Sequence, residues 1–276
     1  MSAPKESRYV LDIVSMTDTG RVRAHNEDSI VVSGDFGLVI LADGMGGYNA
    51  GEVASGMAAS IVQQVVEEAL PLPETVGAED TSQAVKQLLT KAISKANHAI
   101  LDAAGNTSDY SGMGTTIVAA LFQRDAVTIA HVGDSRAYRL RDRHLMQMTR
   151  DHSLLQEQVD AGLISAEQAQ FAQHKNLITR AVGVDLIVET ETNEFMLAPD
   201  DVYLLCSDGL SDMMNDSFIA EILNTCGDDV TKAGNMLVSY ANQQGGRDNI
   251  SVILIRVFVA ASASKNFFDR CRQWVK

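Results

Sequence analysis

The sequence predicts an α+β domain in which helices cover antiparallel sheets. Short β-type runs alternate along the chain with two long helical patterns. Tight turn signals separate several pairs of these runs, which is typical of antiparallel hairpins. No internal repeat, low-complexity tract or Pro/Gly/Ser linker divides the 276 residues. We therefore predict one domain over residues 1–260, followed by a short basic tail over residues 261–276.

The first elements expected along the chain are strands. Residues 9–14 form one β-type run, and residues 29–33 and 36–42 form two more. Gly34 and Asp35 lie between the second and third runs, and this pair favours a tight turn. The second and third runs are therefore predicted to form a hairpin.

Two helical patterns follow the hairpin. Over residues 51–70 apolar side chains recur four residues apart, at Val53, Met57, Ile61 and Val65. This spacing places them on one face of a helix. The second pattern covers residues 82–104 and has a longer apolar stripe. Both helices are expected to pack one face against a sheet.

Strand patterns return after the second helix. We expect strands over residues 115–122, 126–132, 136–140, 144–148, 186–196, 202–206 and 250–259. Short helices are expected over residues 216–224 and 228–242. Residues 151–172 have a helical but polar pattern, so we expect them to lie over the surface rather than in the core.

Composition and charge exclude several classes of protein. The net charge is −14, from 22 basic and 36 acidic residues. A surface this acidic repels phosphate backbones, so nucleic acid is not expected as a partner. The three cysteines have neither metal-like nor redox-like spacing, which fits a reducing cytosol. The sequence shows no secretory signal and no transmembrane run, and we expect a soluble, cytoplasmic protein.

Four aspartates lie in matching contexts at strand ends. Asp43, Asp134 and Asp208 each follow an apolar strand, and Asp248 precedes the last strand. Because the end of one antiparallel strand lies beside the start of the next, these residues could share one rim of a sheet. Four carboxylates there would repel one another unless cations lay between them. Oxygen-only ligation favours Mg²⁺ or Mn²⁺ over zinc, although any one of these aspartates alone could simply form a β-turn.

Eight short motifs make the resemblance to a known family specific. They occur in that family's order between residues 20 and 255, at Arg23–Asp28, Asp43–Gly47, Met113–Thr116, Val132–Arg136, Thr149–Ser153, Ile178–Gly183, Ser207–Leu210 and Gly246–Asn249. In these stretches the chain resembles the metal-dependent type 2C protein serine/threonine phosphatases, in their compact bacterial form. The resemblance implies a central antiparallel β-sandwich flanked by helices on both faces, which is a four-layer α-β-β-α arrangement.

The resemblance also implies an activity and partners. The expected reaction is hydrolysis of phosphoserine and phosphothreonine on proteins, which reverses serine/threonine kinase signalling. The expected substrates are a bacterial kinase and its targets, and the chain is expected to be a monomer. Two Mn²⁺ or Mg²⁺ ions would occupy the core site, with a third bound more weakly.

The metal ligands are assigned by matching positions. The resemblance implies that Asp43 bridges two metals and that Asp208 and Asp248 complete the shell of the first. The carbonyl of Gly44 would bind the second metal. Asp134, together with Asp208, would form the third site.

The remaining site residues are expected to act on water and substrate. Glu27 and Asp28 would hold metal-bound waters, and Arg23 would grip the substrate phosphate, which suits a guanidinium group. The cations would lower the pKa of a bridging water, which would then attack phosphorus in line. Eukaryotic relatives often have a proposed general acid, a histidine, where this chain has Met45. The proton donor therefore stays open between a metal-bound water, an unidentified residue, His25 and His152.

Two segments outside the motifs have two readings each. Residues 151–177 correspond to a flap beside the active site in bacterial relatives, or are an ordinary surface helical pair. The tail over residues 261–276 could dock on an acidic partner or a membrane surface. It could equally be a frayed end or a helix packed on its own domain.

Two other functions compete with the phosphatase interpretation. A pseudophosphatase would bind partners without turnover, but it should have degraded metal ligands, and Asp43, Asp208 and Asp248 are all present. A Mg²⁺-dependent nuclease would need a basic groove, which a net charge of −14 disfavours.

Overall fold

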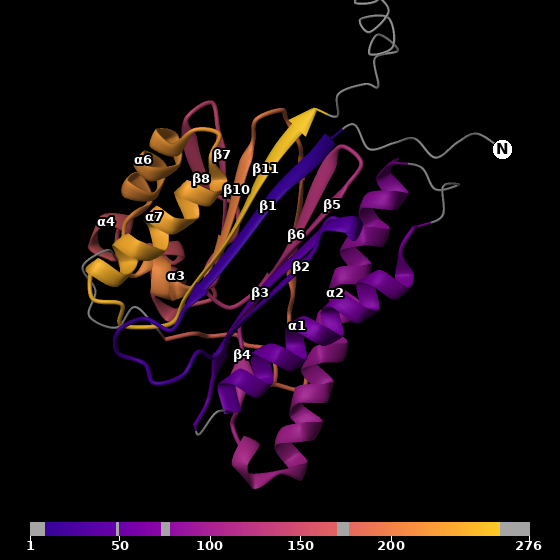
Figure 1. Cartoon of the computed structure of the whole chain (residues 1–276). Helices are drawn as coiled ribbons and strands as arrows, with labels where there is room; N and C mark the ends of the chain where they lie inside the picture. The colour runs from indigo at the N-terminus through magenta and orange to yellow at the C-terminus, as the bar shows by residue number, and fades with distance from the viewer. Residues whose placement is uncertain (1–8, 48–49, 73–77, 170–176, 260–276) are drawn as a thin grey trace, which may run out of the picture.

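A computed structural model describes residues 9–47, 50–72, 78–169 and 177–259 of the chain (Figure 1). Two antiparallel sheets face each other in it. The first sheet has the strand order β1 (Tyr9–Asp18), β11 (Ile250–Val259), β10 (Val202–Cys206), β7 (Arg136–Arg141) and β8 (His144–Gln147). The second has the order β2 (Asp28–Ser33), β3 (Leu38–Met45), β5 (Ile117–Gln123), β6 (Ala126–Val132) and β9 (Glu191–Met196), and the short strand β4 (Gly114–Thr115) pairs with β3.

Helices cover the outer face of each sheet. The long helices α1 (Ala50–Ala69) and α2 (Ala78–Asn106) pack on the second sheet, and α6 (Asp216–Cys226) and α7 (Val230–Gln243) pack on the first. Three shorter helices, α3 (Leu154–Asp160), α4 (Ala166–Ala169) and α5 (Asp208–Ser211), lie in connections. The predicted four-layer α-β-β-α sandwich is therefore confirmed. Among the described residues, no helix is both long enough and apolar enough to cross a membrane.

The core has three layers of apolar side chains, and strand alternation decides which layer each residue joins. On β3, Val39 and Leu41 point between the sheets, whereas Leu38 and Ile40 pack under α1 and α2. On β10, Leu205 packs between the sheets and Leu204 packs under the helices α6 and α7. Because both faces of these strands are buried, their sequences are continuous apolar runs rather than alternating ones.

Most predicted elements appear with shifted ends, but two strand predictions were wrong in part. The strand predicted over residues 186–196 begins only at Glu191, and Leu186 and Ile187 are 78% and 84% exposed. The partner strand β6 stops at Val132, and Gly133 then turns the chain away with a φ of +103°, so residues before Glu191 have no strand to pair with. The strand predicted over residues 115–122 is split between β4 and β5.

The segment predicted as a flap contains two short helices, α3 and α4. Gly162, with a φ of +69°, lies between them and ends the first helical stretch. Ser153 caps α3, because its hydroxyl accepts a hydrogen bond from the Gln156 amide. Residues 170–176 of the predicted flap and the whole tail over residues 261–276 lie outside the described residues.

Candidate active site

The predicted metal ligands come from both sheets and meet at one end of the sandwich. Asp43 lies on β3 and Asp134 follows β6, so both belong to the second sheet. Asp208 begins α5 directly after β10, and Asp248 lies just before β11, so both belong to the first sheet. The expectation that all four share the rim of one sheet was therefore wrong. The rim is formed where the two sheets face each other.

The sequence pattern predicted that Asp43 follows the end of its strand. In the structure the strand continues past Asp43. β3 continues through Gly44 to Met45, because these residues pair with Thr115 and Gly114 of β4. The Asp43 amide donates a 3.0 Å hydrogen bond to Thr116 Oγ1, and its carbonyl accepts from Thr115 Oγ1 at 2.8 Å. The Asp43 backbone is thus held on both sides.

The aspartates act on one another electrostatically. Burial, followed by the negative charges of Asp28, Asp208, Asp134 and Asp248, raises the pKa of the Asp43 carboxyl well above its usual range. Burial also raises the pKa of Asp208 well above its usual range, with smaller contributions from Asp134, Asp212, Asp248 and Asp28. Without cations, this group of carboxyls therefore favours bound protons over full ionisation.

Asp28 faces Asp43 across the β2–β3 pair. Ser207 Oγ, from the other sheet, donates a 2.9 Å hydrogen bond to Asp28 Oδ2. The second oxygen, Oδ1, is buried without a hydrogen-bond partner. Burial raises the pKa of Asp28 to about 6.

Asp134 also has a buried side-chain oxygen, Oδ1, without a hydrogen-bond partner. Burial and the charge of Asp151 raise the pKa of Asp134 to about 7. A buried carboxylate oxygen that lacks a donor is costly, and a hard cation is a partner that would satisfy it. The residues present therefore fit divalent cations bound by oxygen.

Gly44 lies where β3 passes closest to α1. A Cβ atom built there would stand 2.1 Å from the Gly51 carbonyl oxygen and 2.6 Å from that of Glu27. The Gly44 amide also donates a 3.1 Å hydrogen bond to the Glu27 carbonyl. Packing of the backbone against α1 therefore requires glycine at this position, independently of any bound metal.

Asn249 has a structural role that the sequence motif did not reveal. Its Oδ1 accepts the Glu27 amide at 2.8 Å, and its Nδ2 donates to the carbonyls of Thr19 and His25 at 3.0 and 2.9 Å. The side chain is 4% exposed. The side-chain amide of Asn249 thus holds the loop that carries Arg23. The only sequence signal for this role was the position of Asn249 beside Asp248.

Arg23 is paired with one of the predicted ligands. Its Nη2 donates to Asp248 Oδ2 at 2.6 Å, and its side chain is 50% exposed. The guanidinium group therefore lies at the acidic rim and within reach of solvent. Glu27 follows on the same loop, and burial raises the pKa of its carboxyl.

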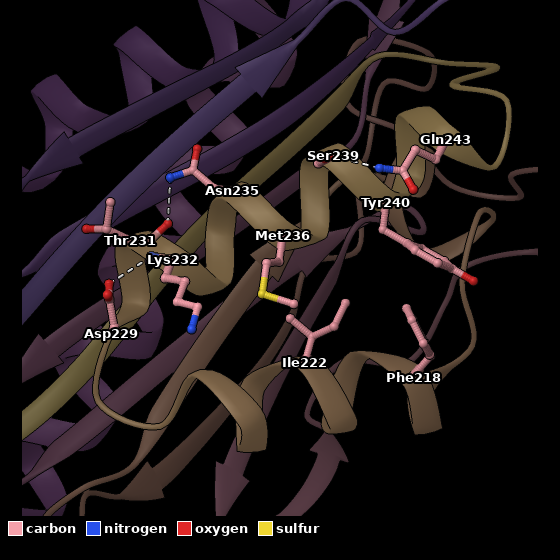
Figure 2. A pocket seen from close by; sticks show the side chains of 10 residues that line it. All are labelled: Phe218, Ile222, Asp229, Thr231, Lys232, Asn235, Met236, Ser239, Tyr240 and Gln243. Atoms are coloured by element: carbon pink, nitrogen blue, oxygen red, sulfur yellow. Dashed lines mark hydrogen bonds between the residues drawn. The ribbon is translucent and has the colours of Figure 1, made fainter.

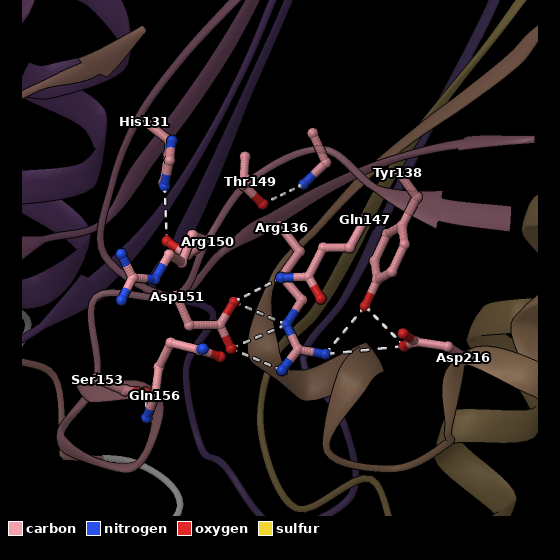
Figure 3. Close-up of polar contacts among 11 residues, drawn as sticks. His131, Arg136, Tyr138, Gln147, Thr149, Arg150, Asp151, Ser153, Gln156 and Asp216 are labelled. Carbon is pink, nitrogen blue, oxygen red and sulfur yellow. Dashed lines mark hydrogen bonds and ion pairs between the residues drawn. The ribbon is translucent and has the colours of Figure 1, made fainter. Parts of the chain in front are cut away.

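A half-buried arginine connects the rim to the predicted flap (Figure 3). Arg136 lies two residues after Asp134, and its Nε and Nη2 donate to both oxygens of Asp151 at 2.6 to 3.0 Å. Arg136 Nη1 donates to Tyr138 Oη at 2.9 Å, and Tyr138 donates in turn to Asp216 at 3.0 Å. The start of the flap segment is therefore bound to the strand that follows Asp134.

The histidines near the rim differ in their surroundings. His131 and His152 stack with ring centroids 4.8 Å apart. His131 Nε2 lies 2.8 Å from the Arg150 carbonyl oxygen (Figure 3). His152 Nδ1 accepts the Gly133 amide, and burial lowers the pKa of His152 to about 4. A histidine that stays neutral at physiological pH is poorly suited to donate a proton as the general acid.

His131, His152 and Glu191 form the one group of three within the described ranges whose ligand atoms all lie within 4.8 Å of one another. Because His152 Nδ1 accepts a backbone N–H, its Nε2 holds the proton and offers no lone pair to a metal. His152 Nε2 lies 3.7 Å from Glu191 Oε2, too far for a hydrogen bond, so we describe this group as a cluster of polar side chains rather than as a metal site. Within the same described ranges, no three of the predicted carboxylate ligands lie this close together.

Comparison with known proteins identifies the family. The family model described as protein phosphatase 2C matches residues 20–239. The chain therefore belongs to the protein phosphatase 2C family. The serine/threonine phosphatase stp of Listeria monocytogenes is 40% identical over 242 residues, which cover 87% of this chain and 93% of that protein.

Solved structures agree in fold. The crystal structure of the Mycobacterium tuberculosis serine/threonine phosphatase PstP/Ppp has a TM-score of 0.80 and 36% identity, and the match covers 90% of this chain and 99% of that one. The catalytic domain of PstP in complex with two manganese ions has a TM-score of 0.78 and 37% identity, covering 91% and 99% of the two chains. The protein is thus a serine/threonine protein phosphatase of bacterial type.

Proposed function

We propose that the acidic rim binds two Mn²⁺ or Mg²⁺ ions and that the loaded site hydrolyses phosphoserine and phosphothreonine in proteins. The observation that carries this proposal is the pair of buried, unpartnered carboxylate oxygens, Asp28 Oδ1 and Asp134 Oδ1, within one group of mutually repelling aspartates. Cations would offset that repulsion and supply the missing partners. The manganese ions in the related PstP catalytic domain support the choice of metal.

The ligand roles follow from position in the rim. Asp43 is the proposed bridging ligand, since its carboxyl is affected by Asp28, Asp134, Asp208 and Asp248 together. Asp208 and Asp248, from the facing sheet, are the proposed further ligands of the first ion. The Gly44 carbonyl is the proposed ligand of the second.

A third ion is proposed between Asp134 and Asp208. Burial, followed by the charge of Asp134, raises the pKa of Asp208, which supports an ion between these two carboxyls. Asp212, one helical turn after Asp208, adds negative charge to both. Its place four residues after Asp208, directly after the end of α5, is a signal that sequence reasoning could have used.

When bound, the cations would activate a water for attack on phosphorus and offset the charge of the phosphoryl oxygens. The protein's own groups position the reactants. Glu27 and Asp28 are the proposed acceptors that orient water at the rim. Arg23 is the proposed phosphate ligand, and it would exchange part of its contact with Asp248 for the phosphate oxygens. Met45 lies on β3 and cannot donate a proton to the leaving alkoxide.

The proposed substrates are phosphorylated proteins, among them a serine/threonine kinase and its targets. We also propose that the protein acts as a monomer in the cytoplasm. Cys206 and Cys226 are buried free thiols, which a reducing compartment would preserve.

Phosphate release from a phosphothreonine peptide tests the proposed function. The wild type is assayed with Mn²⁺ and with a chelator, beside Asp208→Ala and the matched control Asp125→Ala. Asp125 is exposed in the β5–β6 turn, outside the rim. We expect Mn²⁺-dependent release by the wild type and the control, and a loss of at least ~100-fold in Asp208→Ala. Absence of Mn²⁺-dependent release from the wild type would refute the proposal.

A further inference from the structure

The outer helices α6 and α7 enclose an apolar groove on the surface (Figure 2). Its volume is about 780 Å³. Phe218 and Ile222 line it from α6, and Met236 and Tyr240 line it from α7. Met236 is 37% exposed, and its sulfur lies 3.4 Å from Sγ of the core residue Cys226. The groove therefore offers apolar surface that the described residues leave uncovered.

The groove extends along α7 toward the active-site rim. Phe218 and Tyr240 pack with ring centroids 4.2 Å apart, and both also line a second hollow next to the groove. Met213 and Met214, shortly after α5, line that second hollow. A helix of 14 residues such as α7 is about 21 Å long, so a ligand that covers the whole groove needs a similar length.

The border of the groove carries acidic side chains beside one lysine. Asp229 and Lys232 line the groove, Glu221 lines the second hollow, and Asp228, in the α6–α7 connection, pairs with Arg256. An amphipathic segment with basic flanks would complement both the apolar floor and the acidic border.

The chain itself contains such a segment after β11. Residues 260–276 have four basic residues against the single acidic Asp269, in a chain with a net charge of −14. On a helix, apolar side chains of this segment would share one face, namely Phe267, Phe268, Cys271, Trp274 and Val275. A helix of these 17 residues would be about 25 Å long, which matches the groove.

The segment also starts beside the groove. Arg256 of β11 pairs with Asp228 in the α6–α7 connection at 2.6 Å, and it packs over the Phe258 ring. Asp229, the next residue, lines the groove. Val259 is three residues beyond Arg256, or about 10 Å along the strand. The chain therefore leaves the last strand close to one end of the groove.

We propose that residues 260–276 dock as an amphipathic helix in the α6–α7 groove of the same chain. The aromatic side chains of the segment pack on Phe218, Met236 and Tyr240. Its basic side chains face the acidic border of the groove. This docking is independent of metal binding and of the phosphatase reaction.

Cys271 provides a probe of the proposal in the full chain. A nitroxide label is attached to Cys271, and the methionine methyl signals are compared with those of the reduced label by NMR. Cys206 and Cys226 are buried, and Cys271→Ser controls for any label on them. We expect the Met236 methyl signal to be lost and that of Met57, on α1 across the sandwich, to be retained. Retention of the Met236 signal would overturn the proposal.

A groove variant and a mixing experiment complete the test. In the labelled wild type the methyl signals of Met213 and Met214, which line the second hollow, should also be lost. In labelled Met236→Lys they should return, because the new charge in the groove repels the basic segment. Met196→Lys, at the end of β9 and away from the groove, places the same charge on the surface (Met196 is 63% exposed and Met236 37%) and should leave their loss unchanged. Labelled protein is also mixed with an isotope-labelled Cys271→Ser chain. Signal loss in the isotope-labelled chain would show docking on a second copy and overturn the proposal for the same chain.

Discussion

Neutral side chains hold the charged residues of the rim in place. Ser207 Oγ contacts Asp28 Oδ2 and also accepts the Ser251 amide at 3.0 Å. Thr116 Oγ1 accepts the Asp43 amide and shares a 2.7 Å hydrogen bond with Ser135. These groups fix the carboxylates and leave Asp28 Oδ1 without a protein partner. Uncharged supports suit this task, because further fixed charges would compete with a cation.

Replacing Asn249 by alanine should lower the free energy of unfolding by about 2 kcal/mol. The substitution leaves the Glu27 amide and the carbonyls of Thr19 and His25 without their hydrogen-bond partner. Urea denaturation in chelator measures this change. Asn193→Ala, which removes one hydrogen bond to Glu191 on β9, is the matched control and should stay within ~0.5 kcal/mol of the wild type. Equal losses in the two variants would contradict the anchoring role of Asn249.

Among the elements, β7 and the start of the flap segment are bound as a unit. The Arg136–Asp151 contact uses two guanidinium nitrogens and both carboxylate oxygens. Gln147, at the end of β8, adds a 2.9 Å hydrogen bond to Asp151 Oδ1. The α3 helix begins three residues after Asp151, so its position depends on this contact. A flap that moves would therefore do so about a fixed base.

Arg136→Lys should loosen the start of the flap segment, because an ammonium group cannot reproduce the two-nitrogen contact. We expect amide hydrogen exchange in α3 to become about tenfold faster, with α1 unchanged. Arg141→Lys removes a similar two-nitrogen contact, to Asp201, and serves as the control. If Arg141→Lys speeds exchange in α3 as much, the effect is general destabilisation rather than loss of the anchor.

For the whole molecule, the rim is a point where folding opposes the ionisation of the carboxyl groups. The fold brings aspartates of both sheets together, and burial raises the pKa values of Asp28 and Asp134 to about 6 and about 7. The folded state therefore holds protons on these groups at pH values where the unfolded chain has released them. By linkage, these two carboxyls make the metal-free protein less stable as the pH rises from about 4 to about 7, and together they exceed the opposite contribution of His152, whose pKa burial lowers to about 4.

The melting temperature in chelator should therefore fall between pH 5 and pH 8, and Mn²⁺ should raise it more at pH 8 than at pH 5. Cations bind the ionised carboxylates, so their stabilising effect grows as protons leave. Differential scanning fluorimetry across this range, with and without Mn²⁺, measures both trends. An increment from Mn²⁺ that does not depend on pH would contradict the assignment of the rim carboxyls as ligands.

The sequence alone determined the local structure and the family. Continuous apolar runs such as residues 126–132 and 202–206 predicted β6 and β10 with their observed ends, because a strand buried on both faces has little freedom in its composition. Helical spacing predicted α1 within one residue at each end. The ordered motifs identified the phosphatase family, which the family model then confirmed.

Tertiary structure alone decided which strand ends meet. Local sequence shows that an aspartate ends or begins a strand, but the pairing of β10 with β11 and of β3 with β5 is long-range. The rim therefore turned out to join two sheets, and Asn249 and Arg136 acquired partners far away in the sequence. Only packing showed that Gly44 is required by its approach to α1. Contacts between distant segments depend on the whole fold, and no local pattern contains them.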